Sequence, residues 1–324
     1  MKNNQQGTSM KLITRISLAS HLLLASLLPL PAVGGENISP PRDQMISAGC
    51  NSKLSILLSN DDGFDKPGII ALQQVLSQDQ HRVVLAAPAK NASGSSASMT
   101  FTPVVVEQVR DNTYAISASP ATSVVLAVSA LYPPDSPPDL VISGINDGAN
   151  LGPATGISGT VGATTVAIEI LEPPIPAIAI STDPLGPDYS AQENTEHLQA
   201  IAAFTLDLVN HLNENRCKSG LLLPKGLALN INYPALPSEK IKGIAMKEQG
   251  QAPYFKISYK PSKKDANIFL PVFKARPLGA DIKQSDTTAY HQGYITIVAM
   301  DGDYTSKSPA ITAIIEPLIL KLKP

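Results

Sequence analysis

The sequence predicts an α/β fold of the doubly wound kind, in which helices cover both faces of a mostly parallel sheet. Three short segments in the first half, residues 54–58, 82–87 and 140–143, are almost continuously apolar. An apolar run without alternation is typical of a strand that is buried on both faces. Helical patterns fill the gaps between these segments, and the order strand, helix, strand indicates a parallel sheet with crossover helices.

The individual helices are predicted from apolar residues at helical spacing and from the residues that bound them. Pro67 and Gly68 open one such stripe at residues 69–76, and a second stripe at residues 124–131 ends before Pro133. The other expected elements are a helix from 158–160 to 170, a strand at 177–181, a helix at 198–212, strands at 228–233 and 294–299, and a closing helix at 310–320.

Residues 241–286 depart from this pattern. They form polar, lysine-containing segments with alternating apolar positions, such as residues 255–259. Alternation is typical of strands with one exposed face. We therefore predict a C-terminal β-hairpin extension that projects from the core and could pair subunits.

The composition limits the class of partner. The chain has 324 residues, 43% of them hydrophobic, and a formal net charge of -2. Its basic residues are not clustered, so a small-molecule substrate fits better than a nucleic-acid backbone. With only 2 cysteines and 5 scattered histidines, a disulfide framework and a histidine-rich zinc site are both disfavoured. Whether Cys50 and Cys217 pair stays open.

Residues 1–34 have the pattern of a secretory signal peptide. Lys11 and Arg15 precede an apolar run at residues 18–30, and small residues follow it at cleavage-site spacing. The run is shorter than the roughly 20 residues that span a bilayer, so we expect no stable membrane anchor. The predicted mature protein is exported, either periplasmic or secreted. The predicted divisions of the chain are a signal peptide (1–34), a linker (35–53) and a single domain (54–324) with its hairpin extension at about 241–286.

A polar loop follows each of the three apolar segments of the first half. These loops lie at residues 59–63, 90–96 and 144–150. In an open parallel sheet, ligands bind beyond the carboxyl ends of the strands. The three loops are therefore expected to converge on one site.

Asp61 and Asp62 are the best candidates for a metal site in these loops. They stand where the first strand ends, so their side chains are not forced to opposite faces and both can bind one ion. With the Ser93 hydroxyl and the Asn146 amide oxygen they form an all-oxygen set suited to one divalent ion, Mg²⁺ or Mn²⁺. The alternative is that residues 60–63 form only a turn, because Asn, Asp and Gly favour turns.

Ser158, Gly159 and Thr160 open the third predicted helix. The free N–H groups of a helix start, together with two hydroxyls, can bind a phosphate oxyanion. Helix capping alone is an equally good interpretation of these residues. Neither a Walker A loop nor a GxGxxG loop follows a strand, which disfavours a nucleoside triphosphatase or a dinucleotide oxidoreductase.

Four motifs together give the sequence a specific resemblance. They are LLSNDDG at 57–63, AP at 87–88 with NASG at 91–94, SGIN at 143–146 with NLG at 150–152, and SGTV at 158–161. Their order and spacing are similar to those of the SurE (survival protein E) family of nucleotidases. A looser likeness at 229–234 and 293–294 extends the resemblance over most of residues 54–305.

The resemblance implies a three-layer α/β/α, Rossmann-like core and a 5′/3′-nucleotidase that hydrolyses nucleoside 5′- and 3′-monophosphates. The family's metal ligands correspond to Asp61, Asp62, Ser93 and Asn146, with both aspartates at the catalytic centre. A C-terminal hairpin exchanged between subunits is also implied, in a homodimer or homotetramer. The sequence leaves open whether water or Asp61 attacks phosphorus.

The chain departs from the family pattern at three places. It has Ala89-Lys90 where the family usually has Asp-Arg, ASPATS at 118–123 in place of Gly-Thr-Pro-x-Asp-Cys, and Ile157 in place of Tyr. Because the metal ligands are retained, we expect activity to be retained and substrate preference to differ. Two alternatives remain: an exported nucleotide-binding protein, which would need two similar lobes, and a degenerate member without activity.

Overall fold

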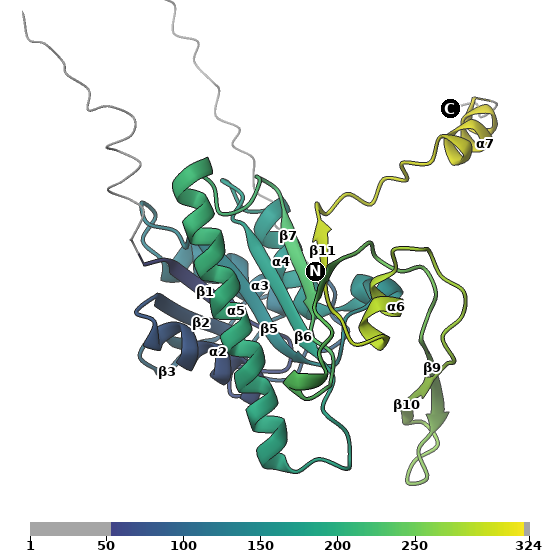
Figure 1. Cartoon of the computed structure of the whole chain (residues 1–324), viewed down its shortest axis with the longest axis horizontal. Coiled ribbons are helices and arrows are strands. Elements are labelled where there is room, and N and C mark those ends of the chain that lie inside the picture. The colour runs from purple at the N-terminus through teal and green to yellow at the C-terminus, as the bar shows by residue number, and fades with distance from the viewer. Residues whose placement is uncertain (1–52, 321–324) are drawn as a thin grey trace, which may run out of the picture. The chain divides into compact units, whose positions relative to one another are not determined.

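A nine-stranded sheet forms the centre of residues 53–320, the part of the chain that the computed structural model describes (Figure 1). The strand order is β3-β4-β2-β1-β5-β6-β7-β11-β8. The six strands from β4 to β7 are parallel to one another. Strand β3 is antiparallel to β4, and β11 is antiparallel to β7. The bounds are β1 (Ser55–Ser59), β2 (Arg82–Pro88), β3 (Val106–Arg110), β4 (Thr113–Ile116), β5 (Leu140–Asp147), β6 (Ala177–Thr182), β7 (Ala228–Asn232), β8 (Ile244–Met246) and β11 (Ile295–Met300).

Helices cover both faces of this sheet. One buried cluster contains Leu72 and Ile201, which come from α2 and α5. The cluster on the opposite face contains Val124 and Val166, which come from α3 and α4. The helical segments are α2 (Pro67–Gln78), α3 (Pro120–Leu126), the π-helical turn η1 (Ala127–Leu131), the 3-10 turns η2 (Gly152–Ile157) and η3 (Ser238–Lys240), α4 (Gly159–Glu169), α5 (Ala191–Ser219), α6 (Asp286–His291) and α7 (Pro309–Ile319). The predicted three-layer α/β/α fold is confirmed.

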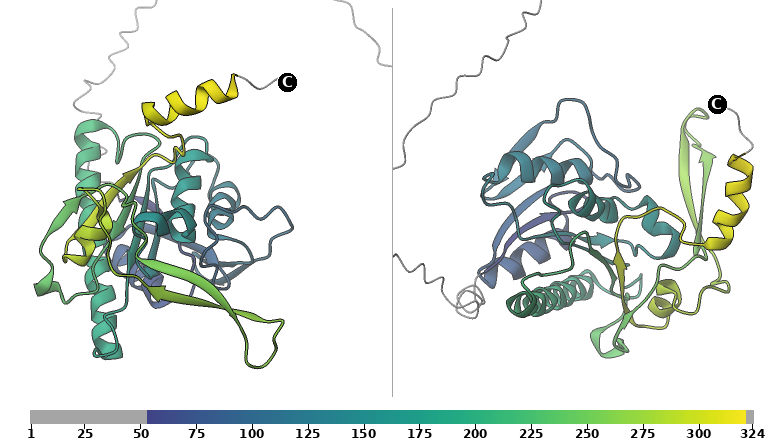
Figure 2. Two further views of the ribbon diagram at one scale, coloured as in Figure 1. Left: turned by 90° about the vertical axis from the view of Figure 1, so that its right-hand side faces the viewer. Right: turned by 90° about the horizontal axis from the view of Figure 1, so that it is seen from above.

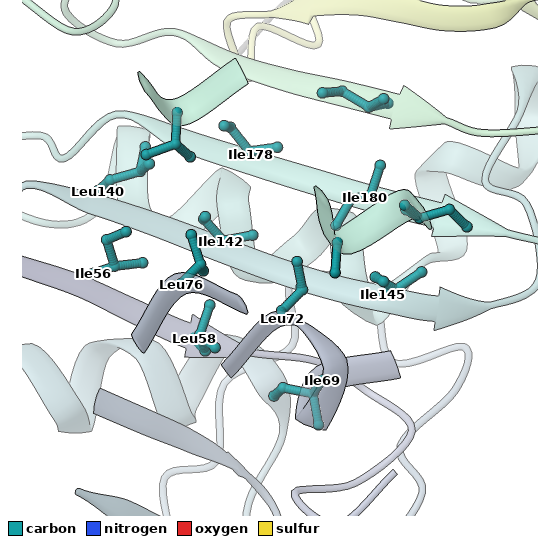
Figure 3. Close-up of a cluster of buried hydrophobic side chains, with 14 of the residues drawn as sticks. Ile56, Leu58, Ile69, Leu72, Leu76, Leu140, Ile142, Ile145, Ile178 and Ile180 are labelled. Atoms are coloured by element: carbon teal, nitrogen blue, oxygen red, sulfur yellow. The ribbon is translucent and has the colours of Figure 1, made fainter. Parts of the chain in front are cut away.

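Strand β1 shows why the apolar runs are continuous. Ile56 and Leu58 belong to the cluster beneath α2 and α5, whereas Leu57 between them belongs to the cluster beneath α3 and α4. Figure 3 shows the first of these clusters, with Leu72 and Leu76 of α2 among the strand side chains. Since successive side chains of a strand point to opposite faces, a strand with helices on both faces must be apolar at every position.

Helix ends follow local signals. Pro67 is in the first turn of α2, and Ser158 caps α4 by accepting a hydrogen bond from Val161 N. Helix α5 is longer than the predicted 198–212 because a capping box between Ser190 and Glu193 starts it earlier. It ends at Gly220, whose φ of 81° is favourable for glycine.

Three strands of the main sheet were not predicted, and one is longer than predicted. Strand β8 lies within residues 241–286, which were expected to project from the core, but it pairs with β11. Strand β3 is exposed and β4 has only four residues, so neither produces a long apolar run. Strand β5 does not end at Ser143 but continues to Asp147 after an irregularity in its pairing with β6. Asn146 consequently lies in a strand, paired with Ser181, and not in the loop where it was expected.

The C-terminal part contains the predicted hairpin. Strands β9 (Phe255–Pro261) and β10 (Phe269–Ala275) pair only with each other, and Figure 2 shows them as a separate arm. Helix α7 has no buried residue, so it does not close the core of this chain as a closing helix would. Between residues 53 and 320, no helix is long and apolar enough to span a membrane. The predicted signal peptide and Cys50 lie outside the described residues.

Candidate active site

The segment after β1 places two aspartates at the carboxyl edge of the sheet. The Asn60 side chain holds the turn at both ends, because its Nδ2 donates to Gly63 O (2.9 Å) and its Oδ1 accepts from Gly63 N (3.1 Å). This confirms that residues 60–63 form a turn. The turn leaves Asp61 and Asp62 buried, with exposed fractions of 3% and 8%. The turn is therefore the means by which the two carboxylates are presented together.

Asp61 is bonded to the start of α4. Its Oδ2 accepts a hydrogen bond from Gly159 N (3.1 Å), and its Oδ1 accepts one from the Thr160 hydroxyl (2.5 Å). Both donors belong to the group that was predicted to hold phosphate. Ser158 does not bond to Asp61. Its hydroxyl oxygen instead accepts the capping hydrogen bond from Val161 N (3.1 Å). Capping is therefore the observed role of Ser158.

Gly159 cannot carry a side chain in this arrangement. A Cβ atom there would lie 2.8 Å from Asp61 Oδ2 and 2.6 Å from Ser95 Oγ. The Ser95 hydroxyl is itself buried and has no hydrogen-bond partner among the described residues. A third polar group, not predicted from the sequence, thus lies beside Asp61 at the helix start.

Asp62 faces the end of β5. Its Oδ2 accepts a hydrogen bond from Asp147 N (3.0 Å). Asn146, the residue before, is buried, and its Nδ2 donates to Gly148 O (2.5 Å). This bond uses the amide nitrogen and leaves Oδ1 as a possible ligand. Asp62 and Asn146 line the same cavity.

Ser93 lies in the loop after β2, which is bonded to the aspartates through its backbone. Ala92 N donates to Asp61 O (2.7 Å), and Ser93 N donates to the side-chain oxygen of Asn91 (3.0 Å). Ser93 itself is exposed. The loop therefore lies against the first aspartate, as the convergence of strand ends predicts.

The electrostatics of the pair suit a cation. Burial raises the pKa of Asp61 above its usual value and raises the pKa of Asp62 to about 6, and the charge of Asp61 contributes to the second shift. Within the described residues, neither carboxylate has a basic side chain within 4.0 Å. Two adjacent buried carboxylates are unfavourable when both are charged, and a hard divalent ion would offset that cost. The donor set thus fits a hard metal ion.

The residues that follow Asn146 are held by later parts of the chain. Ala149 N donates to Asp183 Oδ1 (2.9 Å), and the Tyr254 hydroxyl donates to Ala149 O (2.7 Å). The Tyr290 hydroxyl donates to the other oxygen of Asp183 (2.8 Å). Sequence spacing gave no sign of these contacts, because each involves residues from well-separated segments. They fix the segment that carries Asn146.

Buried asparagines of β7 extend this support. Asn230 Nδ2 and Asn232 Nδ2 both donate to Asn150 O, at 2.9 and 3.1 Å. Asn232 Oδ1 also accepts from Asn150 N (2.7 Å). This explains why polar residues interrupt the otherwise apolar strand at 228–232.

The fold is a doubly wound α/β domain with two buried carboxylates beyond its strand ends, which is where ligands bind in proteins of this class. The family model described as "Survival protein SurE" matches residues 56–256. The chain is 32% identical to "5'-nucleotidase SurE" of Pseudoalteromonas atlantica over 257 residues, which are 78% of this chain and 94% of the relative. It is 31% identical to "5'-nucleotidase SurE 1" of Burkholderia lata over 252 residues, covering 77% and 91% of the two chains.

A solved structure agrees with these sequence matches. The SurE protein of Aquifex aeolicus superposes with a TM-score of 0.63 at 30% identity, covering 82% of this chain and 99% of that one. The chain belongs to the SurE family. The resemblance that was deduced from the four motifs is confirmed.

Proposed function

We propose that the chain is a metal-dependent phosphomonoesterase that hydrolyses nucleoside 5′- and 3′-monophosphates to nucleoside and phosphate. The pairing of Asp61 with the start of α4 is the observation that carries this proposal. It brings a buried carboxylate to within hydrogen-bonding distance of a helix N-terminus, which is a favourable place for a phosphate group. The relatives named 5'-nucleotidase support the nucleotide as substrate.

The proposed ion is one Mg²⁺ or Mn²⁺, held by the four predicted oxygen ligands (Asp61, Asp62, Ser93 and Asn146). When bound, it supplies positive charge and Lewis-acid polarisation at the phosphoryl group. The protein's own groups orient the Asp61 carboxylate and the phosphoryl group. Gly159 N–H and the Thr160 hydroxyl fix the direction of the Asp61 carboxylate, and the N-terminal dipole of α4 favours negative charge on the phosphoryl oxygens.

We also propose that the protein is exported and works as a homodimer or homotetramer. The signal pattern of residues 1–34 supports export, and N-terminal sequencing from the native host tests it. A protein that keeps its first residues and fractionates with the cytoplasm would contradict export. Exposed apolar side chains on the hairpin and on α7 support self-association, among them Phe269, Phe273, Ile314 and Leu318.

Hydrolysis of adenosine 5′-monophosphate with Mg²⁺ or Mn²⁺, and its loss in excess EDTA, tests the central proposal. An exported nucleotide-binding protein would instead bind the nucleotide without releasing phosphate. A degenerate family member would neither bind metal nor release phosphate. Phosphate release at the same rate in EDTA would contradict the metal dependence.

A further inference from the structure

The loop after β2 borders two hollows, because Asn91 lines both of them. The first is the cavity of about 380 Å³ that Asp62 and Asn146 line, and it belongs to the candidate site. The second has a volume of about 430 Å³, and none of the four proposed metal ligands lines it. Lys90 lines this second space, which we call the Lys90 hollow. It is separate from the proposed metal site and lies next to it along the same loop.

The lining of the Lys90 hollow is positively charged. Nine residues line it, and Lys90 alone among them carries a charge. Lys90 is exposed, and among residues 53–320 no carboxylate lies within 4.0 Å of its ammonium nitrogen. An ammonium group without a carboxylate partner attracts anions, and the walls of a hollow strengthen that attraction. The Lys90 hollow is therefore suited to an anionic group.

Two hydroxyl groups of the hollow can add hydrogen bonds to an anion. The Ser117 hydroxyl oxygen accepts from Val105 N (2.7 Å), and the Thr100 hydroxyl oxygen accepts from Ser119 N (3.4 Å). Neither hydroxyl donates a hydrogen bond to another group in the described part of the chain. Each hydroxyl has one hydrogen to donate, so both hydrogens remain available to an oxygen of a bound phosphate.

The first cavity is a poorer place for a second negative charge. Asp147 and Asp183 line it together with Asp62, and Lys66 is the lysine of that lining. His197 lines it too, but burial lowers the pKa of its imidazole, which is therefore neutral at pH 7. Carboxylates outnumber cationic side chains there even when Asp62 is set aside with the metal ion. A further anionic group on a substrate would be repelled in the first cavity and attracted in the second hollow.

The length of the loop limits the distance between groups bound at the two places. Lys90 is three residues before Ser93, so their Cα atoms are at most about 11 Å apart. Ala92 N donates to Asp61 O (2.7 Å), which ties this part of the loop to the aspartates. The flexible four-carbon stem of a lysine can shorten the remaining gap. The two phosphates of a nucleoside 3′,5′-bisphosphate are separated by one ribose ring, which falls within this range.

We propose that the Lys90 hollow is an anion subsite that binds the second phosphate of a substrate whose first phosphate is hydrolysed at the metal site. The substrate class is a small phosphomonoester that carries a further phosphate, such as a nucleoside 3′,5′-bisphosphate. The Lys90 ammonium and the hydroxyls of Ser117 and Thr100 bind the phosphate that is retained. At the metal site the ester P–O bond breaks and the elements of water add across it. The products are inorganic phosphate and a monophosphate.

This inference rests on the proposed phosphatase function and adds to it the place of a second phosphate. Lys90→Gln tests it, because this change removes the charge and keeps most of the side chain. The probes are adenosine 3′,5′-bisphosphate and adenosine 5′-monophosphate, assayed with the metal-loaded protein. We expect the ratio of kcat/KM for the bisphosphate to that for the monophosphate to fall about fivefold, as for the loss of a partly exposed ion pair. The change should lie mainly in KM, and Lys90→Arg should keep the ratio of the wild type.

Lys225→Gln is the matched control, since it removes the same charge from another exposed lysine. Lys225 precedes β7, which is parallel to β6, so it lies at the edge of the sheet opposite the strand ends that carry the site. Its ratio should stay within about twofold of the wild type, because a charge at that distance is screened. Circular dichroism and thermal unfolding show whether each variant is folded.

Three results overturn the anion subsite while leaving the proposed function standing. They are a ratio that Lys90→Gln leaves unchanged, a ratio that falls equally in Lys225→Gln, and a ratio that falls equally in Lys90→Arg. A wild-type protein that releases phosphate from neither ester with metal present overturns both the subsite and the proposed function.

Discussion

The Thr160 hydroxyl donates a hydrogen bond of 2.5 Å to Oδ1 of Asp61 and so joins the first turn of α4 to the end of β1. Both residues are buried, and the bond ends on a carboxylate that has no basic partner within 4.0 Å among the described residues. A hydrogen bond to a charged group contributes about 1.5–3 kcal/mol, roughly twice the contribution of a neutral one. The orientation of Asp61 should therefore depend on this contact.

Thr160→Val removes the donor with little change of shape. We expect kcat/KM to fall about 10- to 150-fold, because loss of about 1.5–3 kcal/mol in orienting Asp61 corresponds to that factor. Thr160→Ser should recover most of the activity. Thr165→Val on the same helix is the control, since among the described residues the Thr165 hydroxyl donates to Val161 O (3.2 Å), within the helix itself. Equal losses in the two valine variants would show that the effect is on the helix and not on Asp61.

Gly159→Ala tests the close contact between α4 and Asp61. The added Cβ would lie 2.8 Å from Asp61 Oδ2, so either the helix or the carboxylate must move. We expect a loss of about 1–3 kcal/mol in unfolding free energy, as for other overpacked sites, together with a large loss of activity. Gly156→Ala is matched to it, because a Cβ at Gly156 meets no atom within 4 Å. Normal activity of Gly159→Ala would refute the proposed contact.

The metal-free protein should lose stability through Asp62 as the pH rises. Burial raises the pKa of this carboxyl from 3.8 to about 6, so the folded state holds its proton more tightly than the unfolded state does. With more protons bound to the folded form between these values, the contribution of Asp62 to stability is full below pH 3.8 and lost by about pH 6. Thermal unfolding in EDTA from pH 4 to 7 should show a smaller decrease of Tm for Asp62→Asn than for the wild type. Identical pH dependence of Tm in Asp62→Asn and the wild type would contradict this prediction.

Substrate selectivity is expected to depend on Ala89 more than on Thr122, the second position where the family usually has a carboxylate. Ala89 is exposed beside Lys90, whereas Thr122 is buried and its hydroxyl oxygen accepts a hydrogen bond from Thr100 N (2.8 Å). Thr122 thus secures the start of α3, which favours a structural role for that position. We expect a broad phosphomonoesterase that discriminates weakly between a nucleoside 5′-monophosphate and a simpler or more highly charged phosphate ester, because the charge of an Asp at position 89 is missing.

Ala89→Asp should strengthen discrimination against more highly charged esters by adding a repulsive charge near the site. The measurement is kcat/KM over 5′- and 3′-mononucleotides, p-nitrophenyl phosphate and short polyphosphate. Thr122→Ser is the control, because it changes the buried position without adding a charge. A wild-type protein with a strong preference for one mononucleotide, or a ranking that Ala89→Asp leaves unchanged, would contradict the role of Ala89.

The parallel core could be predicted from the sequence because its strands are buried on both faces of the sheet. Leu57 and its neighbours Ile56 and Leu58 enter opposite clusters, so the run is apolar throughout and stands out. Strand β3 has no such signal, since Val106–Arg110 has mostly exposed side chains at the sheet edge. The early start of α5 was missed because its first turns are polar and only the capping box marks them.

Some residues of the site could likewise be predicted from the sequence, and others could not. Asp61 and Asp62 could be found because two carboxylates directly follow a buried strand, and parallel strands place their ends together. Asp183 and His197 could not, because each lies in an ordinary sequence context and becomes part of the cavity only when β6 and α5 pack together. Tyr254 and Tyr290 are further examples, since they reach Ala149 and Asp183 from the C-terminal part of the chain.

The most direct test of the metal-dependent phosphatase assignment combines Mn²⁺ binding with adenosine 5′-monophosphate hydrolysis in Asp61→Asn and Asp62→Asn. Asp65→Asn serves as the control, because Asp65 is an exposed carboxylate in the same loop. We predict that both site variants fold, bind Mn²⁺ weakly and lose about 100-fold or more in kcat/KM, while Asp65→Asn resembles the wild type. Full Mn²⁺ binding and full activity in either site variant would contradict the account.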